Sequence, residues 1–464
     1  MSLPDRDTLD KSVLRAADIR GVAGLTLTNR SAELIGRAFG TVLIRTGLRK
    51  CLVGGDGRLS TPDLSAALIR GLLSCGVEVI NIGCCPTPML YFSVVLTKKA
   101  GGVMVTASHN PKEYNGFKLM IDGKSFCADN IQNLGKLIDR RDFEQGKGSV
   151  HTEDFSDRYL DRLVRDFRFE GKPLTVVWDC GNGTAGTVVP GLIRRLPGRH
   201  IILNEQVDGN FPAHAPDSSK IENLSVLQET VLREKADLGL AFDGDSDRLG
   251  VIDSQGEMLE TDHLLQIFAE EILKTTPNAV FIADIKSSKT FVSEIRQMGG
   301  RPLIWRTGHS FIKTKMQETG APLGGEMSGH ICFADKYYGF DDALYAAVRL
   351  LDIAVNQKNE SLQDRISRIP KTFASPEIQI ACPDKDKFQC VEKIKEILRA
   401  RGESFDETDG IKLVYPSTGW WLLRASNTSP SLVCRCEADT PAELNLLKKD
   451  LFELIEKVQP IEFI

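Results

Sequence analysis

The stretch KCLVGGDGR, at residues 50–58, contains the pattern on which the fold of this chain rests. An apolar run that ends in glycines and an aspartate is typical of a buried strand entering a turn, and the apolar spacing of 61–74 then predicts a helix. The same strand–aspartate–helix order returns in LTVVWDCGNGT at 174–184 and in AVFIADIKSS at 279–288. Because the three copies lie roughly a hundred residues apart, we interpret them as three related α/β units, although single phrases of this kind occur in any α/β protein.

The pattern changes beyond Pro370. A strand at 377–382 and a helix at 388–401 precede three strands and a closing helix, which we predict at 411–415, 419–423, 431–436 and 441–458. This β-α-β-β-β-α order differs from the earlier units and predicts a fourth, smaller α+β domain. We expect the four domains to occupy residues 1–153, 154–255, 256–368 and 369–464.

Length and composition narrow the class of protein. A chain of 464 residues is too long to fold around one hydrophobic core, so we expect about three domains. A formal net charge of −5 argues against nucleic-acid and membrane partners, so an anionic substrate would need local clusters of Lys and Arg. The 11 cysteines form no C-x-x-C pair, which argues against a cysteine-based zinc or redox site and favours free thiols in the cytoplasm. The charged N-terminal segment does not resemble a signal peptide, and no apolar run approaches membrane-spanning length.

The segment GGVMVTASHNPKEYNGFKLM, at 101–120, carries the most chemistry. It predicts a buried strand at 103–105, a polar loop, a turn at 114–116 and a second strand that contains Lys118. Ser108 ends the first strand beside His109, so it is a candidate nucleophile with a base or charge partner. The alternative is that Ser108 only hydrogen-bonds its own turn. The segment does not match the G-x-S-x-G elbow of hydrolases.

A second candidate site lies in LGLAFDGDSDRLGVID, at 238–253. Apolar runs flank Asp243, Asp245 and Asp247, so the aspartates occupy a loop between two buried strands. Three carboxylates this close repel one another unless a cation neutralises them, and hard oxygen ligands suit Mg²⁺ or Ca²⁺. An EF-hand is excluded, because its sixth position would be Arg248 instead of Gly and its twelfth Ser254 instead of Glu. A solvated acidic loop remains the alternative.

Three further loops offer contacts for an anion or a sugar. WRTGHS at 305–310 follows an apolar strand and contains His309, and GGEMSGH at 324–330 sets Glu326, Ser328 and His330 between glycines. RASNTSP at 424–430 offers a guanidinium, an amide, hydroxyls and turn N–H groups, which suit a phosphate. Each loop alone is weak evidence, because such residues also fill ordinary turns.

Four ordered motifs, TASHNP, DGDSDR, GEMSGH and RASNTSP, resemble the α-D-phosphohexomutase superfamily over essentially the whole chain. The resemblance implies an α/β fold of three related α/β domains with mixed sheets and a smaller C-terminal α+β domain, arranged around a central cleft. It also implies a cytoplasmic enzyme, which we expect to be a monomer. Two positions depart from the family pattern: Ala17 replaces a frequent aromatic residue, and Ser246 replaces a frequent glycine.

The resemblance further implies a reaction. Ser108 would carry a phosphoryl group beside one Mg²⁺ per chain, held by Asp243, Asp245 and Asp247. The enzyme would interconvert hexose 1-phosphate and hexose 6-phosphate of mannose and glucose, with hexose 1,6-bisphosphate as intermediate and activator; the alternative is a mutase that acts mainly on one sugar. Lys118, Arg20 and His109 would stabilise charge or move protons, with His330 as a general base. Substrate contacts would come from Arg248, Lys286, His309, Glu326, Ser328, Arg424, Ser426, Asn427 and Thr428.

Two other functions stay open at this point. An Asp-nucleophile phosphatase would use Asp243 and Asp245, but such enzymes usually have Thr or Val where this chain has Asp247. A sugar-phosphate sensor without catalysis gains little support from an intact Ser108 and metal loop. Burst release of free phosphate would favour the phosphatase.

Overall fold

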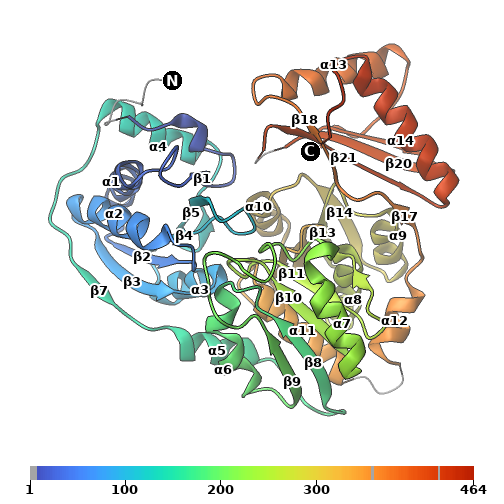
Figure 1. Cartoon of the computed structure of the whole chain (residues 1–464), viewed down its shortest axis with the longest axis horizontal. Coiled ribbons are helices and arrows are strands. Elements are labelled where there is room, and N and C mark those ends of the chain that lie inside the picture. Colours follow the sequence, from blue (N-terminus) through green and yellow to red (C-terminus); the bar gives the residue numbers. More distant parts are fainter. Residues whose placement is uncertain (1–7, 357–359, 427–428, 464) are drawn as a thin grey trace.

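The computed structural model describes residues 8–356, 360–426 and 429–463. Its chain forms four sheets, each with its own helices (Figure 1). The first sheet has the order β1-β5-β4-β2-β3-β7, with β6 paired to β5. The elements of this first unit are η1 (Lys11–Val13), β1 (Ile19–Val22), α1 (Asn29–Arg45), β2 (Lys50–Gly55), α2 (Thr61–Ser74), β3 (Glu78–Cys84), α3 (Thr87–Thr97), β4 (Ala100–Val105), β5 (Tyr114–Ile121), β6 (Lys124–Ser125), α4 (Asp129–Arg140) and β7 (Val150–Thr152).

The second and third sheets follow in chain order. The second has the order β12-β11-β10-β8-β9, and the third β14-β13-β15-β16. The second unit contains α5 (Ser156–Val164), β8 (Leu174–Asp179), η2 (Thr184–Thr187), α6 (Val189–Ile193), β9 (Gly198–Leu203), η3 (Ile221–Leu224), α7 (Ser225–Glu234), β10 (Leu238–Phe242), β11 (Leu249–Ile252) and β12 (Met258–Leu259). The third contains α8 (Thr261–Leu273), β13 (Val280–Asp284), α9 (Lys289–Gln297), β14 (Arg301–Trp305), α10 (His309–Thr319), β15 (Leu323–Gly325), β16 (Ile331–Phe333), α11 (Ala343–Val355) and α12 (Leu362–Arg368).

A common sheet order relates these three units. The runs β3-β2-β4-β5, β9-β8-β10-β11 and β14-β13-β15-β16 each place three parallel strands beside one antiparallel strand. The repeated strand–aspartate phrases form the equivalent strands β2, β8 and β13. The prediction of three related α/β units with mixed sheets is therefore confirmed.

The remaining sheet belongs to the C-terminal domain and has the order β17-β21-β20-β19, with β18 paired to β21. The predicted order of elements is confirmed, preceded by the short β17. The bounds are β17 (Phe373–Ala374), β18 (Ile378–Ala381), α13 (Lys387–Ala400), β19 (Ile411–Tyr415), β20 (Gly419–Ala425), β21 (Ser431–Ala438) and α14 (Pro441–Glu456).

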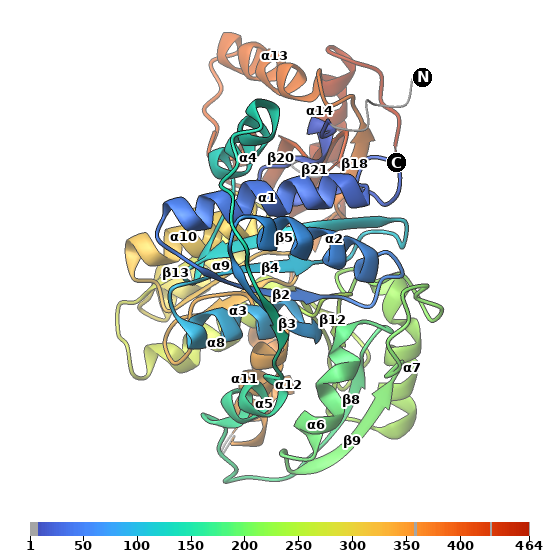
Figure 2. The same ribbon diagram turned by 90° about the vertical axis from the view of Figure 1, so that its left-hand side faces the viewer.

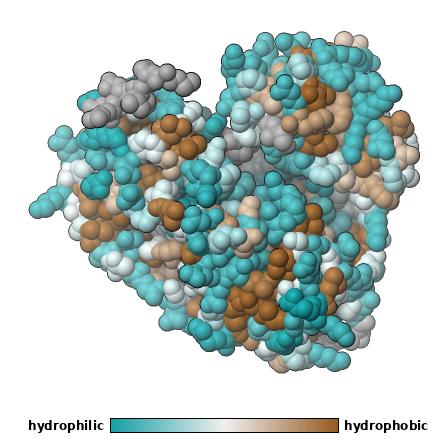
Figure 3. All heavy atoms as spheres, in the orientation of Figure 1, coloured by the Kyte–Doolittle hydropathy of each residue, from teal (hydrophilic) through white to brown (hydrophobic). Residues whose placement is uncertain are grey.

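Apolar packing fuses the three α/β units but leaves the last domain more separate. One buried cluster runs from Leu52 in the first unit through Trp178 to Phe281 in the third. On β2, Leu52 joins this cluster, whereas its neighbours Cys51 and Val53 pack into a second cluster under α1 and α2. Helices therefore cover both faces of the first sheet, with α3 opposite α1 and α2 (Figure 2). The C-terminal domain has its own core, and the surface is hollowed between it and the first unit (Figure 3).

One local prediction is wrong. Residues 114–116 are not a turn but the start of β5, and Gly116 pairs with Arg20 of β1. The glycine is needed because a Cβ there would lie 2.1 Å from the Ile19 carbonyl oxygen, so close strand packing explains it. Thr87 begins α3, and Pro88 is tolerated there because it lies in the first helical turn. No helix in the described ranges is long and apolar enough to cross a membrane.

Candidate active site

The candidate site is built from one equivalent loop of each α/β unit. Ser108 follows β4, the aspartate triad follows β10, and Glu326 to His330 follow β15, which is the third parallel strand in every unit. In each case the chain then returns as the antiparallel fourth strand. A bridge between Arg248 and His330 joins the second and third of these loops. The repeated topology therefore brings together three motifs that are far apart in sequence.

Ser108 is buried at the meeting of the first two loops. Its Oγ donates a hydrogen bond of 2.6 Å to Asp243 Oδ2, and its amide N–H donates to Thr106 Oγ1. The backbone φ of Ser108 is +52°, a left-handed conformation that costs about 1–3 kcal/mol in a non-glycine residue unless its surroundings hold it. His109 Nδ1 lies 3.4 Å from Ser108 Oγ. Burial, with Arg248 and Arg20 nearby, holds the pKa of His109 well below its usual range, so the imidazole is neutral.

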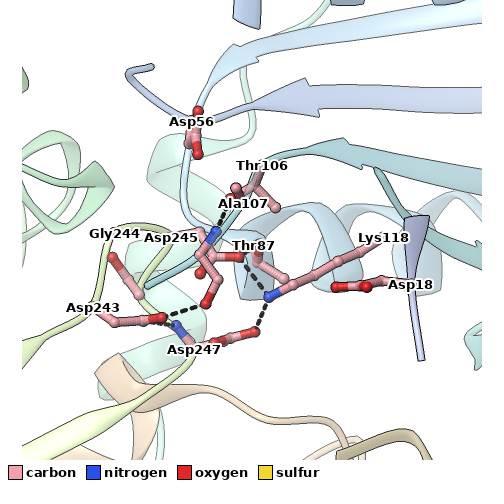
Figure 4. Close-up of polar contacts among 12 residues, drawn as sticks. Asp18, Asp56, Thr87, Thr106, Ala107, Lys118, Asp243, Gly244, Asp245 and Asp247 are labelled. Carbon is pink, nitrogen blue, oxygen red and sulfur yellow. Dashed lines mark hydrogen bonds and ion pairs between the residues drawn. The ribbon is translucent and has the colours of Figure 1, made fainter. Parts of the chain in front are cut away.

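The three aspartates of the second loop are fully buried, and Asp245 and Asp247 point toward Lys118 (Figure 4). Lys118 Nζ donates to Asp245 Oδ2 at 2.6 Å and also to Asp247. Burial and then repulsion from Asp245 and Asp247 raise the pKa of Asp243 well above its usual range. Burial alone would also raise the pKa of Asp245, but the Lys118 ammonium lowers it. The positive charge of Lys118 therefore offsets only part of the negative charge of the three carboxylates in this loop.

The carboxylate cluster fits a bound divalent cation. One oxygen from each of Asp243, Asp245 and Asp247 lies within 4.8 Å of the others. Asp245 Oδ1 and Asp247 Oδ1 are buried without a hydrogen-bond partner in the described part of the chain. Buried carboxylate oxygens of this kind are costly to leave unpaired, and hard cations prefer them as ligands. Ser246 adopts φ +62°, a left-handed conformation that glycine would adopt more readily.

Two arginines position the Ser108 loop, and only one of them was singled out from the sequence. Arg20 Nη1 donates to the Ala107 carbonyl oxygen at 3.1 Å and to Asn110 Oδ1 at 2.6 Å. Arg58, which sequence reasoning missed, is fully buried and donates to Asp56 and to four backbone carbonyl oxygens, those of Ser108, Asn110, Pro111 and Tyr114. Its only sequence signal was its place at the end of the stretch KCLVGGDGR.

The histidines of the third unit also cluster around a residue that the sequence did not reveal. The rings of His309 and His330 stack with centroids 4.9 Å apart, and both approach the buried carboxylate of Asp341. Lys313 Nζ donates to the same carboxylate at 2.8 Å. His330 Nε2 accepts from Arg248 Nε at 3.1 Å. Asp341 and Lys313 belong to no recognisable motif, so nothing in the local sequence could have identified them.

Glu326 and Lys286 lie near one another in the third unit. Burial raises the pKa of Glu326, which accepts a hydrogen bond from the Gly308 amide. Burial would lower the pKa of Lys286, but Glu377 and Asp284 outweigh it and raise that pKa. Lys286 Nζ donates to Glu377 Oε2 at 3.1 Å, which links this unit to the C-terminal domain. Ser328 is half-buried in the same loop as Glu326.

The C-terminal loop lies beside the third unit as well. Arg424 Nε donates to Asp409 Oδ2 at 2.9 Å, and the same oxygen accepts from the Thr307 amide. Arg424 Nη2 is buried without a hydrogen-bond partner in the residues described. The Ser426 carbonyl accepts from Lys387 Nζ at 2.6 Å. The other two predicted substrate contacts of this loop, Asn427 and Thr428, lie outside the described residues.

Fold and site thus define a four-part α/β protein in which a buried serine faces a carboxylate cluster suited to a divalent cation. Profiles of four domain families match the chain in order. They are described as phosphoglucomutase/phosphomannomutase alpha/beta/alpha domain I at residues 11–145, domain II at 157–256, domain III at 260–373 and the C-terminal domain at 377–454.

Individual relatives agree with these profiles. A phosphomannomutase/phosphoglucomutase of Pseudomonas aeruginosa is 43% identical over 466 residues, covering 100% of both chains. A phosphoglucomutase of Neisseria gonorrhoeae is 39% identical, covering 97% of this chain and 98% of its own. The crystal structure of a phosphoglucomutase/phosphomannomutase family protein from Burkholderia thailandensis superposes with a TM-score of 0.90 at 39% identity, covering 98% of this chain and 100% of that one. This chain belongs to the phosphoglucomutase/phosphomannomutase family.

Proposed function

We propose that this enzyme interconverts hexose 1-phosphate and hexose 6-phosphate, and that it accepts both mannose and glucose. The observation that carries the proposal is the 2.6 Å hydrogen bond from Ser108 Oγ to Asp243, inside the carboxylate cluster. A serine hydroxyl beside these carboxylates can carry a phosphoryl group, because a cation bound to the carboxylates neutralises the phosphoryl charge. Relatives named for both sugars over the full chain length support the double specificity.

In the proposed reaction, phosphorylated Ser108 gives its phosphoryl group to the free hydroxyl of a hexose phosphate. The bond between phosphorus and Ser108 Oγ breaks as the bond to the sugar oxygen forms, and the sugar hydroxyl loses its proton to a base. The resulting hexose 1,6-bisphosphate turns within the cleft. Ser108 Oγ then forms a bond to the other phosphorus as the bond from that phosphorus to its sugar oxygen breaks, and the freed sugar oxygen takes up the proton that the base had removed. Catalysis of this kind depends mainly on positioning and on charge stabilisation.

The chain's own residues have distinct proposed tasks. Neutral His109 lies beside Ser108 Oγ and can accept a proton there. Lys118 and Arg20 supply positive charge next to the transferring group. His330, proposed as the general base at the sugar, has its Nε2 on Arg248, so proton transfer through that nitrogen requires Arg248 to move away.

We propose Mg²⁺ as the ion, one per chain, with Asp243, Asp245 and Asp247 as ligands together with the phosphoryl oxygen on Ser108. When bound, it would withdraw charge from that phosphoryl group. An N-acetylphosphoglucosamine mutase from Aspergillus fumigatus was solved with GlcNAc-6P and magnesium, and a serine-to-alanine variant of it with glucose 1,6-bisphosphate; at 13% identity these structures share only the fold with this chain. They make hexose 1,6-bisphosphate a reasonable activator to test here.

Substrate contacts are proposed from the other loops. Glu326 and Ser328 would bind two adjacent ring hydroxyls such as O3 and O4, which glucose and mannose present identically, because the two sugars differ only at C2. This explains acceptance of both sugars. The phosphate that is not transferred would lie between the third unit and the C-terminal domain, near Arg248, Lys286, His309, Arg424, Ser426, Asn427 and Thr428.

The remaining proposals concern the whole chain. We propose domain boundaries at 1–153, 154–255, 256–368 and 369–464, which keep every sheet within one domain except for the short edge strand β12. We also propose a monomer in the cytoplasm, in keeping with eleven cysteines that form no disulfide.

A coupled assay tests the proposal. Glucose 1-phosphate and mannose 1-phosphate, each with a trace of the bisphosphate, should be converted to the 6-phosphates with kcat/KM values within about tenfold, or about 1.4 kcal/mol. Ser108→Ala should lose nearly all turnover and the single phosphate that intact-mass analysis finds on the wild type. Ser293→Ala is the control, because that hydroxyl donates to the Thr290 carbonyl within α9, away from the site. Full turnover in Ser108→Ala, or release of free phosphate in place of isomerisation, would refute the proposal.

A further inference from the structure

A second group of possible metal ligands lies beside the aspartate triad. His309 at the start of α10, His330 before β16, Asp341 before α11 and Asp247 of the triad each offer one ligand atom, and these four atoms lie within 4.8 Å of one another. His309 Nδ1 is 2.8 Å from Asp341 Oδ2, and His330 Nδ1 is 3.1 Å from the same oxygen. His330 Nδ1 is also 3.5 Å from Asp247 Oδ1. Four donors from separate loops therefore converge on one point.

Most of these donors have no partner outside the cluster. Asp247 Oδ1, His330 Nδ1 and Asp341 Oδ2 are buried, and within the described ranges no residue outside the cluster hydrogen-bonds them. All three residues are less than one-tenth exposed. Because these buried atoms have only one another as partners, a cation among them would satisfy all of them at once.

The two carboxylates are arranged in the same way around this point. Asp341 uses Oδ1 to accept from Lys313, and Asp247 uses Oδ2 to accept from Lys118. Each lysine therefore takes one oxygen of its carboxylate and leaves the other facing the histidines. Lys313 Nζ also lies 3.1 Å from His309 Nδ1, so it must release that nitrogen when a cation binds, while keeping its bond to Asp341 Oδ1. Arg248 Nε must likewise release His330 Nε2, because a neutral imidazole that binds a cation through Nδ1 carries its proton on Nε2.

We propose that His309, His330, Asp341 and Asp247 form a second metal site that binds Zn²⁺. Two imidazole nitrogens and two carboxylate oxygens are a donor set that suits tetrahedral Zn²⁺, whereas the triad offers oxygens alone and suits Mg²⁺. Zn²⁺ here takes an oxygen of Asp247 and holds both histidines. If the proposed mutase function is right, Zn²⁺ inhibits the enzyme and Mg²⁺ does not relieve the inhibition; the binding itself does not depend on that function.

The test measures the ion directly. Chelator-stripped full-length protein is dialysed against Zn²⁺ in the presence of excess Mg²⁺, and bound zinc is counted by elemental analysis. His309→Gln and His330→Gln each remove one nitrogen donor. His151→Gln is the control, because His151 is exposed on β7. Asp243→Asn removes a triad ligand outside the cluster, and its amide oxygen can still accept the Asp247 N–H that Asp243 Oδ1 accepts at 3.1 Å.

The wild type, His151→Gln and Asp243→Asn should each hold one Zn²⁺ that Mg²⁺ does not displace. His309→Gln and His330→Gln should bind it at least about tenfold more weakly. Thermal unfolding checks that each variant is folded, and Co²⁺ in place of Zn²⁺ should show the visible absorption of a four-coordinate ion, lost in the same two variants. Displacement by Mg²⁺, equal binding by His309→Gln and wild type, or loss only in Asp243→Asn would overturn the proposal.

Discussion

Arg58→Lys should damage the Ser108 loop more than any other conservative arginine change on this face. The Arg58 guanidinium donates to five acceptors: Asp56 Oδ2 and the carbonyl oxygens of Ser108, Asn110, Pro111 and Tyr114. A lysine ammonium has only three N–H donors, so at least two of the five acceptors lose their partner. At about 1–3 kcal/mol for each unsatisfied buried acceptor, the variant should lose about 2–6 kcal/mol of stability.

The same substitution should also lower the catalytic rate, because it disturbs Ser108. This residue holds a left-handed φ of +52° only because its surroundings over-determine it, and its carbonyl is one of the five acceptors. With that carbonyl freed, Ser108 can relax away from Asp243. We expect kcat to fall at least about tenfold, equivalent to about 1.4 kcal/mol in the barrier, even in molecules that remain folded.

Urea unfolding and the coupled mutase assay check both effects. Arg70→Lys is the matched control, because Arg70 lies on the neighbouring α2, is 58% exposed and approaches Glu33 only to 3.9 Å. Surface pairs of this kind contribute about 0–1 kcal/mol, so the control should behave like the wild type. If Arg58→Lys also stayed within about 0.5 kcal/mol of the wild type and kept its kcat, the loop would be held by other contacts and the reasoning would be wrong.

Three further predictions concern the metal, pH and the C-terminal domain. Chelation by EDTA should abolish turnover and Mg²⁺ should restore it, whereas Asp245→Asn should weaken that response; an unchanged Mg²⁺ dependence would make the carboxylate cluster purely structural. Burial raises the pKa of Asp342 to about 6, so the folded state holds its proton more tightly than the unfolded state, whose pKa is 3.8. The stability that this proton contributes is therefore present below about pH 4 and is lost as the pH rises to about 6. In urea unfolding, the wild type should lose up to about 3 kcal/mol of stability across that window relative to Asp342→Asn. Parallel pH profiles of stability for the two proteins would contradict this prediction. Arg424→Ala should raise KM, by about 2 kcal/mol of lost binding for a charge-assisted contact, and an unaltered KM and kcat/KM would place the phosphate elsewhere.

The sequence by itself determined the repeated architecture and most of the reacting groups. Apolar periodicity is a local property, so the helix predicted at 61–74 coincides with α2, and the strand predicted at 411–415 coincides with β19. Ser108 and the triad could be identified for a related reason. A nucleophile beside a histidine and three clustered aspartates each carry their chemistry within a few consecutive residues, where a reader of the sequence can recognise it.

Only the tertiary structure decided which residues surround those groups. Arg58 contacts the Ser108 loop across about fifty residues of sequence, and Asp341 contacts both Lys313 of α10 and His330 beside β16. Gly116 looked like a turn residue until β1 was placed beside it. Local periodicity predicts which face of a helix or strand is buried, but it does not predict which other residues pack against that face. Partners of this kind are set by how the helices, strands and loops of each unit pack together, and that packing joins residues far apart in the sequence.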